Sequence, residues 1–174
     1  MLLRPFCTSI FRRRLFTTKR IIDIYTDGSC YYDKKANVSG GYAVYFPGAE
    51  HPTICETVNM PLITSNRCEI LGVHRALMIC NDKFRGITCH IYTDSMYVIN
   101  VLYRFSPLWR ENGWIKSDGS AVKNKDLLEK MCLVFDDVKN DVSVKHVKAH
   151  TGKNDVYSRN NSIVDMLAKS KSRK

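Results

Sequence analysis

Two apolar segments of this chain end in the same way, with a threonine followed by an aspartate. Residues 21–30 alternate β-branched and aromatic side chains and reach Asp27 just before a Gly-Ser pair. Residues 87–95 repeat this pattern and reach Asp94 before a serine. The alternation is typical of β-strands, and a carboxylate at a strand end is held rigidly beside an open turn. The sequence therefore predicts a functional site around Asp27 and Asp94.

The remaining patterns predict one α/β domain, and 174 residues are enough for one well-packed core. The expected strands cover residues 21–30, 39–46, 53–60, 87–93 and 142–147. Apolar stripes at helical spacing begin at residue 65 and recur over 95–103, 127–135 and 163–168. The order β-β-β-α-β-α-α-β-α predicts a mixed five-stranded sheet flanked by helices, with the first three strands in an antiparallel meander.

Positive charge is concentrated at the start of the chain. The formal net charge is +10, and residues 1–20 contribute six basic and no acidic side chains, which leaves +4 for residues 21–174. A basic surface favours a polyanionic partner, although charge also serves solubility. The Arg-rich, acid-free segment 1–20 is typical of a mitochondrial presequence, and a basic arm that holds nucleic acid is the alternative. We expect a mitochondrial protein, with a nuclear or cytoplasmic location as the alternative, and a domain over residues 21–174.

Two protein classes are disfavoured by composition. No apolar run approaches the length that spans a membrane, so no membrane association is expected. The seven cysteines are an odd number and include no C-x-x-C pair, which argues against a zinc site or a disulfide framework.

Two further carboxylates join the aspartates at the strand ends. Glu69 is expected in the first turn of the helix that begins near residue 65, and Asp165 is expected on the last helix, on the same face as Asn161. Singly, each carboxylate could be a helix cap, a turn residue or a partner of a helix dipole. Together, four carboxylates suit hard cations such as Mg²⁺, and two such ions can promote phosphoryl displacement.

Five sequence blocks resemble type 1 ribonuclease H. They are residues 25–30, 66–70, 92–95 and 148–152, and Asn161 together with residues 165–168. The resemblance implies the ribonuclease H fold, in a single catalytic domain without the added hybrid-binding module, and hydrolysis of the RNA strand of RNA–DNA hybrids. It implies two Mg²⁺ ions, with Mn²⁺ as a possible substitute, held by Asp27, Glu69, Asp94 and Asp165. It also makes His150 the histidine that assists proton transfer or product release. We expect a monomer whose partner is a hybrid duplex.

The same resemblance implies substrate contacts. The positions that match contacts to the RNA strand are Gly28, Ser29, Cys30, Ser65 and Asn66, and Ser95 is a further expected substrate contact. Those that match contacts to the DNA strand are Thr64 and Asn124, at a phosphate, and the aromatic residues Phe105 and Trp109. A protein distinguishes RNA from DNA at such positions by its 2′-hydroxyls. Trp114 is expected to pack in the core instead.

Some positions depart from the family pattern. Ser65 stands where asparagine is usual, and Phe105 replaces a frequent tryptophan. The segment between His150 and Asp165, which contains residues 153–159, is longer than the usual loop. Two other functions remain open: a catalytically inactive nucleic-acid-binding module, and a DNA nuclease or resolvase on the same fold.

Overall fold

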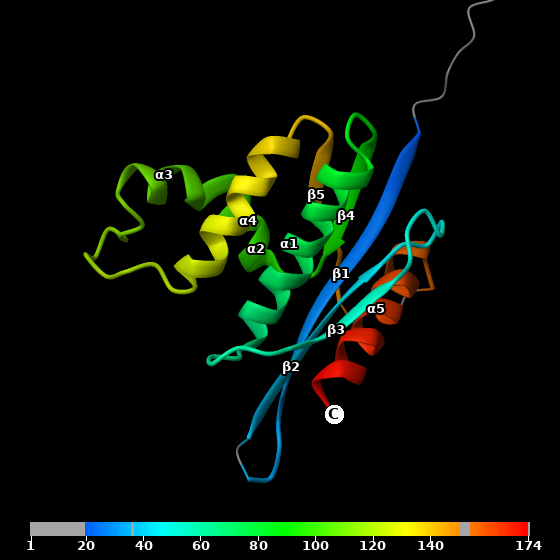
Figure 1. Ribbon diagram of the computed structural model, residues 1–174, viewed down its shortest axis with the longest axis horizontal. Helices are drawn as coiled ribbons and strands as arrows, with labels where there is room; N and C mark the ends of the chain where they lie inside the picture. Colours follow the sequence, from blue (N-terminus) through cyan, green and yellow to red (C-terminus); the bar gives the residue numbers. More distant parts are fainter. Residues whose placement is uncertain (1–19, 36, 150–153, 174) are drawn as a thin grey trace, which may run out of the picture.

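A mixed five-stranded sheet forms the centre of the molecule (Figure 1), as the sequence predicts. The structure is a computed structural model that describes residues 20–35, 37–149 and 154–173. The strands lie in the order β3-β2-β1-β4-β5. β1 runs antiparallel to β2 and parallel to β4, and β5 is parallel to β4. The strand bounds are β1 Ile21–Tyr32, β2 Val38–Tyr45, β3 Ile54–Val58, β4 Thr88–Thr93 and β5 Val142–His146.

Helices cover both faces of this sheet (Figure 1). α1 packs on β1 and β2 on one face and also contacts α4, whereas α5 packs on β1 and β2 from the other face. The helical elements are α1 Ser65–Lys83, α2 Met96–Asn100, the π-helix η1 Val101–Phe105, α3 Ser106–Glu111, α4 Lys125–Val138 and α5 Val156–Ser172.

The predicted element order is confirmed, and three of the differences in element boundaries have an identifiable local cause. β1 continues two residues beyond the expected end, because Asp33 Oδ1 accepts hydrogen bonds from the backbone N–H groups of Lys35 and Asn37 and closes the turn after it. The helix expected over 95–103 continues through the π-helix to Glu111. Pro107 does not interrupt it, because this residue stands in the first turn of α3, where an N–H group needs no partner.

The third difference lies in the long segment after the fifth strand. α5 begins at Val156, so residues 156–159 are helical rather than part of a loop. Asp155 caps this helix and accepts a hydrogen bond from the Ser158 backbone N–H at 2.9 Å. The loop between β5 and α5 is therefore shorter than the sequence predicts. Residues 150–153 of this loop, with His150, lie outside the described residues.

Strand alternation assigns the side chains of β1 to the two faces of the sheet. Ile22 and Ile24 are fully buried in the core on the α1 side. Tyr25 packs on the α5 side, in a cluster with Val164 and Ala168. Because side chains alternate along a strand, Asp27 projects toward the α5 side as well. None of the described helices is long and apolar enough to cross a membrane.

Candidate active site

Asp27 lies in the central strand of the sheet, with 7% of its surface exposed. The neighbouring Gly28 allows β1 to touch α1 backbone to backbone. A Cβ atom on Gly28 would lie 2.1 Å from the backbone nitrogen of Glu69 and 2.2 Å from the carbonyl carbon of Cys68. The missing side chain at Gly28 therefore brings Asp27 and Glu69 together.

Asp94 reaches the same place from the adjacent parallel strand. Tyr25 pairs with Tyr92 in the register of β1 and β4. Asp27 and Asp94 each follow two residues later, so they lie side by side at the same end of the two strands. Burial raises the pKa of Asp94. The side chain of Asn161, buried on α5, hydrogen-bonds the Asp94 carboxylate and opposes this rise.

Glu69 is held in place by a serine on another element. It is the fifth residue of α1, so the expectation that it lies in the first turn is wrong, because the helix already begins at Ser65. The Ser95 hydroxyl donates a hydrogen bond to Glu69 Oε2. The same oxygen of Ser95 accepts from the Val98 backbone N–H at 3.3 Å and caps α2. Ser95, predicted as a substrate contact, is a buried partner of Glu69 in this structure.

Asp165 on α5 lies close enough to Asp27 and Asp94 for its negative charge to raise the pKa of both carboxylates. Its Oδ2 lies 2.8 Å from Lys169 Nζ, one helical turn later. The two side chains are 21% and 39% exposed, respectively. The shared face of Asp165 and Asn161, predicted from their spacing, follows from the helix α5 that carries both.

Electrostatics show that the four carboxylates act on one another. Burial raises the pKa of Asp27 to about 8, with Asp94, Asp165 and Glu69 adding to the rise and the Gly28 backbone N–H opposing it. Burial and the negative charge of Asp94 also raise the pKa of Glu69. Like charges at short range in a buried site stabilise the protonated form. Cations would relieve this repulsion, and an all-oxygen donor set fits hard divalent ions.

The side chains of this cluster are turned toward protein partners. Glu69 bonds Ser95, Asp94 bonds Asn161 and Asp165 pairs with Lys169. With these directions, no three of the described Asp, Glu, His or Cys side chains converge as a ready set of metal ligands. The all-oxygen donor set fits Mg²⁺ in its chemistry, and Glu69, Asp94 and Asp165 would have to turn from these partners toward a shared cation.

Relatives of known class share this fold and sequence. The family model described as RNase H matches residues 19–173. The chain belongs to the ribonuclease H family. Ribonuclease H of Pseudoalteromonas translucida is 34% identical to it over 151 residues, which are 87% of this chain and 89% of the relative. The chain is therefore an enzyme of the hydrolase class that acts on RNA–DNA hybrids.

Two solved structures establish the fold independently. The solution structure of the PFV RNase H domain has a TM-score of 0.70 at 21% identity, and the match covers 87% of this chain and 94% of that domain. A foamy viral protease-reverse transcriptase, solved in complex with an RNA/DNA hybrid, also has a TM-score of 0.70, at 19% identity. That match covers 98% of this chain and 22% of the viral protein.

One residue near the carboxylates was missed by sequence reasoning. His146 ends β5 and pairs in register with Thr93, directly before Asp94. Its charge favours ionisation of Asp94 and so opposes the rise in the pKa of that carboxylate. A partial signal was available, because His146 lies one residue before the end of the strand predicted over 142–147, but nothing in the sequence shows which strands are neighbours.

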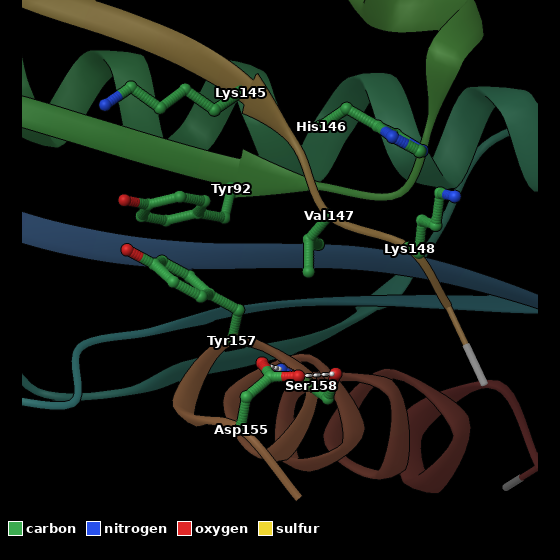
Figure 2. Close-up of a pocket in the computed structure, with 8 residues that line it drawn as sticks. All are labelled: Tyr92, Lys145, His146, Val147, Lys148, Asp155, Tyr157 and Ser158. Carbon is green, nitrogen blue, oxygen red and sulfur yellow. Dashed lines mark hydrogen bonds between the residues drawn. The ribbon is translucent and has the colours of Figure 1, made fainter. Parts of the chain in front are cut away.

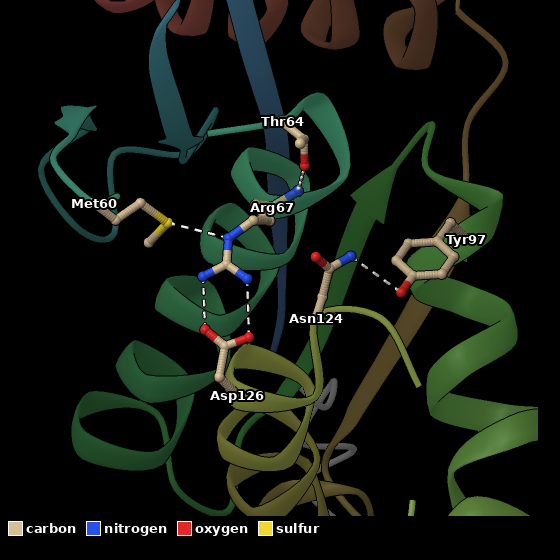
Figure 3. Close-up of polar contacts among 6 residues, drawn as sticks. All are labelled: Met60, Thr64, Arg67, Tyr97, Asn124 and Asp126. Carbon is tan, nitrogen blue, oxygen red and sulfur yellow. Dashed lines mark hydrogen bonds and ion pairs between the residues drawn. The ribbon is translucent and has the colours of Figure 1, made fainter. Parts of the chain in front are cut away.

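A second group of predicted residues gathers at the start of α1 and α4. Thr64, Ser65, Asn66 and Asn124 line one open pocket, together with Tyr32, Leu62, Arg67, Lys123 and Asp126. Figure 3 shows how α1 and α4 meet there. Thr64 Oγ1 caps α1 by accepting from the Arg67 backbone N–H at 3.3 Å. Asn124 has a left-handed backbone, φ 61°, and its side chain donates to the Tyr97 hydroxyl at 3.4 Å.

The aromatic residues of the 105–114 segment divide into two kinds. Phe105 and Trp109 stack on each other with ring centroids 5.3 Å apart and line a surface hollow with Lys116 and Lys123. Trp114 is 8% exposed and belongs to the core, so its predicted packing role is confirmed. The structure thus brings Phe105 and Trp109, but not Trp114, to a basic surface.

The short stretch after Asp27 leads away from the carboxylates along β1. Gly28, Ser29 and Cys30 are each partly exposed. The Ser29 hydroxyl accepts a hydrogen bond from Ser172 Oγ at 2.9 Å, which ties this part of β1 to the end of α5. A substrate strand that contacts residues 28–30 would lie directly beside Asp27.

Proposed function

We propose that this protein cleaves the RNA strand of RNA–DNA hybrids internally, with divalent cations held by Asp27, Glu69, Asp94 and Asp165. The observation that carries the proposal is the action of three carboxylates on a fourth, the buried Asp27, whose pKa is raised to about 8. A cluster of this kind is unfavourable without cations. Divalent metal use is general in the ribonuclease H family, which supports the assignment.

The residues around the carboxylates would position them. Two bound Mg²⁺ or Mn²⁺ ions would supply an activated water and stabilise the leaving oxygen. Ser95 restricts Glu69, and Asn161 restricts Asp94, so both carboxylates are oriented before substrate arrives. The ion pair between Lys169 and Asp165 would break when a cation binds, because the ammonium group and the cation compete for the same carboxylate oxygen. We assign His150 to proton transfer or product release on the family resemblance.

Recognition would depend on the shape and backbone of the hybrid rather than on base sequence. The RNA-side contacts proposed here are Gly28, Ser29, Cys30, Ser65 and Asn66, where 2′-hydroxyls distinguish RNA from DNA. The DNA-side contacts proposed here are Thr64, Asn124, Phe105 and Trp109. Lys123 borders both the pocket of Thr64 and the hollow of Trp109, so one basic surface connects the two. We propose that the protein acts as a monomer.

The test is cleavage of four matched duplexes: RNA–DNA, RNA–RNA, DNA–DNA, and DNA with a single ribonucleotide. Each is incubated with Mg²⁺ and with a chelator, and Asp94→Asn serves as the variant without one proposed ligand. We expect cleavage of the RNA strand of the hybrid alone, only with metal, and none by the variant. Cleavage of DNA would make the protein a DNA nuclease on the same fold, and hybrid binding without cleavage would make it a binding module.

We also infer that residues 1–20 direct the protein to mitochondria. The support is the composition of this segment, which has six basic and no acidic side chains. A fluorescent fusion of residues 1–20 should reach mitochondria and be processed on import. Nuclear or cytoplasmic fluorescence of that fusion, combined with an intact N-terminus on the isolated protein, would contradict this.

A further inference from the structure

An open pocket of about 370 Å³ lies between the end of β5 and the start of α5 (Figure 2). None of the residues predicted from the sequence to bind substrate or metal lines it. Its walls are Tyr92, Lys145, His146, Val147, Lys148, Asp155, Tyr157 and Ser158. Tyr157 stands in the first turn of α5.

The pocket lies next to the carboxylates on the same face of the sheet. Tyr25, Tyr92 and Lys145 pair in register across β1, β4 and β5 and form one row. Asp27 and Asp94 come two residues later on their strands, on the same face, which places them about 7 Å further along. Along β1 the order is therefore the pocket row, the carboxylates, and then the proposed RNA contacts at residues 28–30.

Aromatic rings form the floor and one wall of the pocket. Tyr25 stacks on Tyr92 with ring centroids 4.8 Å apart and planes inclined by 18°. The Tyr157 ring contacts the Tyr92 ring at a tilt, with ring centroids 5.3 Å apart, and the two side chains form a hydrogen bond. Tyr25 and Tyr92 are buried, but Tyr157 is 47% exposed. Among the described residues, Tyr157 therefore offers a partly exposed ring whose position is fixed by its contact with Tyr92.

Two lysines that form no ion pair among the described residues line the same pocket. Lys145 Nζ lies 5.9 Å from the centroid of the Tyr92 ring. Among the ion pairs of the described residues, none involves Lys145 or Lys148. The one carboxylate in the wall, Asp155, accepts from the backbone N–H and the hydroxyl of Ser158 at 2.9 and 3.0 Å. Two lysines therefore remain available to an anion.

We propose that this pocket binds one unpaired nucleotide of an RNA strand that continues single-stranded beyond the hybrid. The base would stack on Tyr157, and Lys145 and Lys148, which lie toward opposite ends of the pocket (Figure 2), would contact the phosphates on either side of that nucleotide. An exposed aromatic ring beside unpaired lysines is the combination that holds single-stranded nucleic acid without base specificity. A base pair inside a duplex has both faces covered and cannot stack in this way. The inference rests on the proposed function, because it takes the RNA strand to be the one that passes the carboxylates.

The experiment compares hybrids that differ only in an unpaired tail. Four substrates share one RNA–DNA duplex. The first is blunt, the second and third carry an unpaired tail at the 5′ or the 3′ end of the RNA strand, and the fourth carries an unpaired tail on the DNA strand. kcat/KM is measured with Mg²⁺ for cleavage at the phosphates nearest the junction. We expect one of the two RNA tails to raise kcat/KM about fivefold or more, the range that one stacked base contributes. The DNA tail should give no comparable gain.

Single variants connect this advantage to the pocket. Tyr157→Ala removes the ring from the exposed first turn of α5 and should make kcat/KM equal for tailed and blunt hybrids. Tyr157→Phe keeps the ring and should retain the ratio of tailed to blunt cleavage. Lys145→Ala and Lys148→Ala should each reduce it. Lys139→Ala removes an equal charge that is paired with Asp136 at the other end of β5 and should leave the ratio intact.

Three outcomes would overturn the inference: equal cleavage of RNA-tailed and blunt hybrids, an equal gain from the DNA tail, or a full tail advantage in folded Tyr157→Ala. The Kd of each substrate, measured with chelator, is a second readout. If no hybrid is cleaved at all, the proposed function fails, and the ratio of tailed to blunt Kd still decides whether the pocket binds an unpaired nucleotide.

Discussion

Two charged clusters of this protein follow opposite electrostatic rules. Asp94, Asp165 and Glu69 act with burial to raise the pKa of Asp27 to about 8, because like charges repel. Arg67 and Asp126 form a bidentate ion pair, with N–O distances of 2.9 and 2.6 Å (Figure 3). Hydrogen bonding to Arg67 lowers the pKa of Asp126. The first cluster costs stability when it is ionised, and the second contributes stability.

The difference separates function from scaffolding. Arg67 is nearly buried on α1 and joins this helix to α4, so its charge has a complete partner inside the protein. The carboxylates have only partial partners in Ser95, Asn161 and Lys169. Groups that are held together against their own repulsion are candidates for ligand binding. Changes in the carboxylate cluster should therefore affect activity most, and changes in the Arg67–Asp126 pair should affect stability most.

Asp27→Asn should have the largest effect on activity, a loss of about a thousandfold or more, because it removes the central proposed ligand. It should also stabilise the metal-free fold near neutral pH. The folded pKa of Asp27, about 8, is above the ordinary 3.8. Between these values the folded state holds a proton that the unfolded state has lost, so wild-type stability falls as pH rises from about 4 to about 8.

This sign can be checked by urea unfolding with chelator at several pH values. The unfolding free energy of Asp27→Asn should fall much less as pH rises, so the difference in stability between the variant and the wild type should grow with pH. An identical pH dependence for both proteins would contradict the electrostatic account of the cluster. Undiminished cleavage by the variant would contradict the assignment of Asp27 as a ligand.

Gly28→Ala tests whether the close approach of β1 and α1 assembles the carboxylates. The new Cβ would overlap the backbone of Cys68 and Glu69, which cannot move alone. We expect a loss of about 3 kcal/mol in unfolding free energy and a loss of activity of at least tenfold in the folded fraction. Gly72→Ala is the matched control on the same interface, where the nearest atom, Asp27 O, lies at 3.2 Å. Equal effects of the two changes would contradict this role of Gly28.

Arg67→Met should destabilise the fold by about 2 kcal/mol, between the values for exposed and buried pairs, since Asp126 is 59% exposed and can be hydrated. Activity should fall much less than in Asp27→Asn. The stability that Asp126 contributes through Arg67 is present above the ordinary Asp pKa and is lost as pH falls into the acid range. Thermal unfolding of Arg67→Met beside Arg110→Met, which breaks the more exposed pair with Asp136, measures the effect. A smaller loss in Arg67→Met than in Arg110→Met would argue against this role.

Lys169→Gln should have the smallest effect and should act on metal dependence. Lys169 holds Asp165 at 2.8 Å, so its removal frees a carboxylate and makes the site more negative. We expect half-maximal activity at about a twofold to threefold lower Mg²⁺ concentration, with a change in stability below about 1 kcal/mol. A Mg²⁺ titration of cleavage measures it, and Lys171→Gln on the same helix controls for net charge. A higher Mg²⁺ requirement in Lys169→Gln would mean that Lys169 assists the site.

Much of the fold could be predicted because the pattern of each element is local. The alternation that ends at Asp27 and Asp94 and the helical stripe after Ser65 predicted strands and helices with ends mostly within a few residues. The larger differences arose where a local pattern is ambiguous. The π-helix at Val101–Phe105 shifts the apolar spacing, and Asp155 starts α5 earlier than the apolar stripe indicates.

The candidate site was predicted as a set of residue types, but its geometry was not. The sequence predicted Asp27, Glu69, Asp94 and Asp165 as a set, because together with their flanking blocks they resemble the ribonuclease H family, although each alone could be a cap or a turn residue. It could not show that Ser95 bonds Glu69 or that Lys169 pairs with Asp165 in place of a cation. His146 was missed because its closeness to Asp94 depends on which strands are neighbours in the sheet.

The sequence by itself determined which elements form, which of their faces are apolar and which residues carry acidic groups, because these properties depend on neighbours along the chain. Only the tertiary structure decided how close those groups lie. The contact of Gly28 with the backbone of α1 and the row of Tyr25, Tyr92 and Lys145 join residues that are far apart in sequence. Burial and like charge raise the pKa of Asp27 only after the chain has folded, since both require those distant groups to meet.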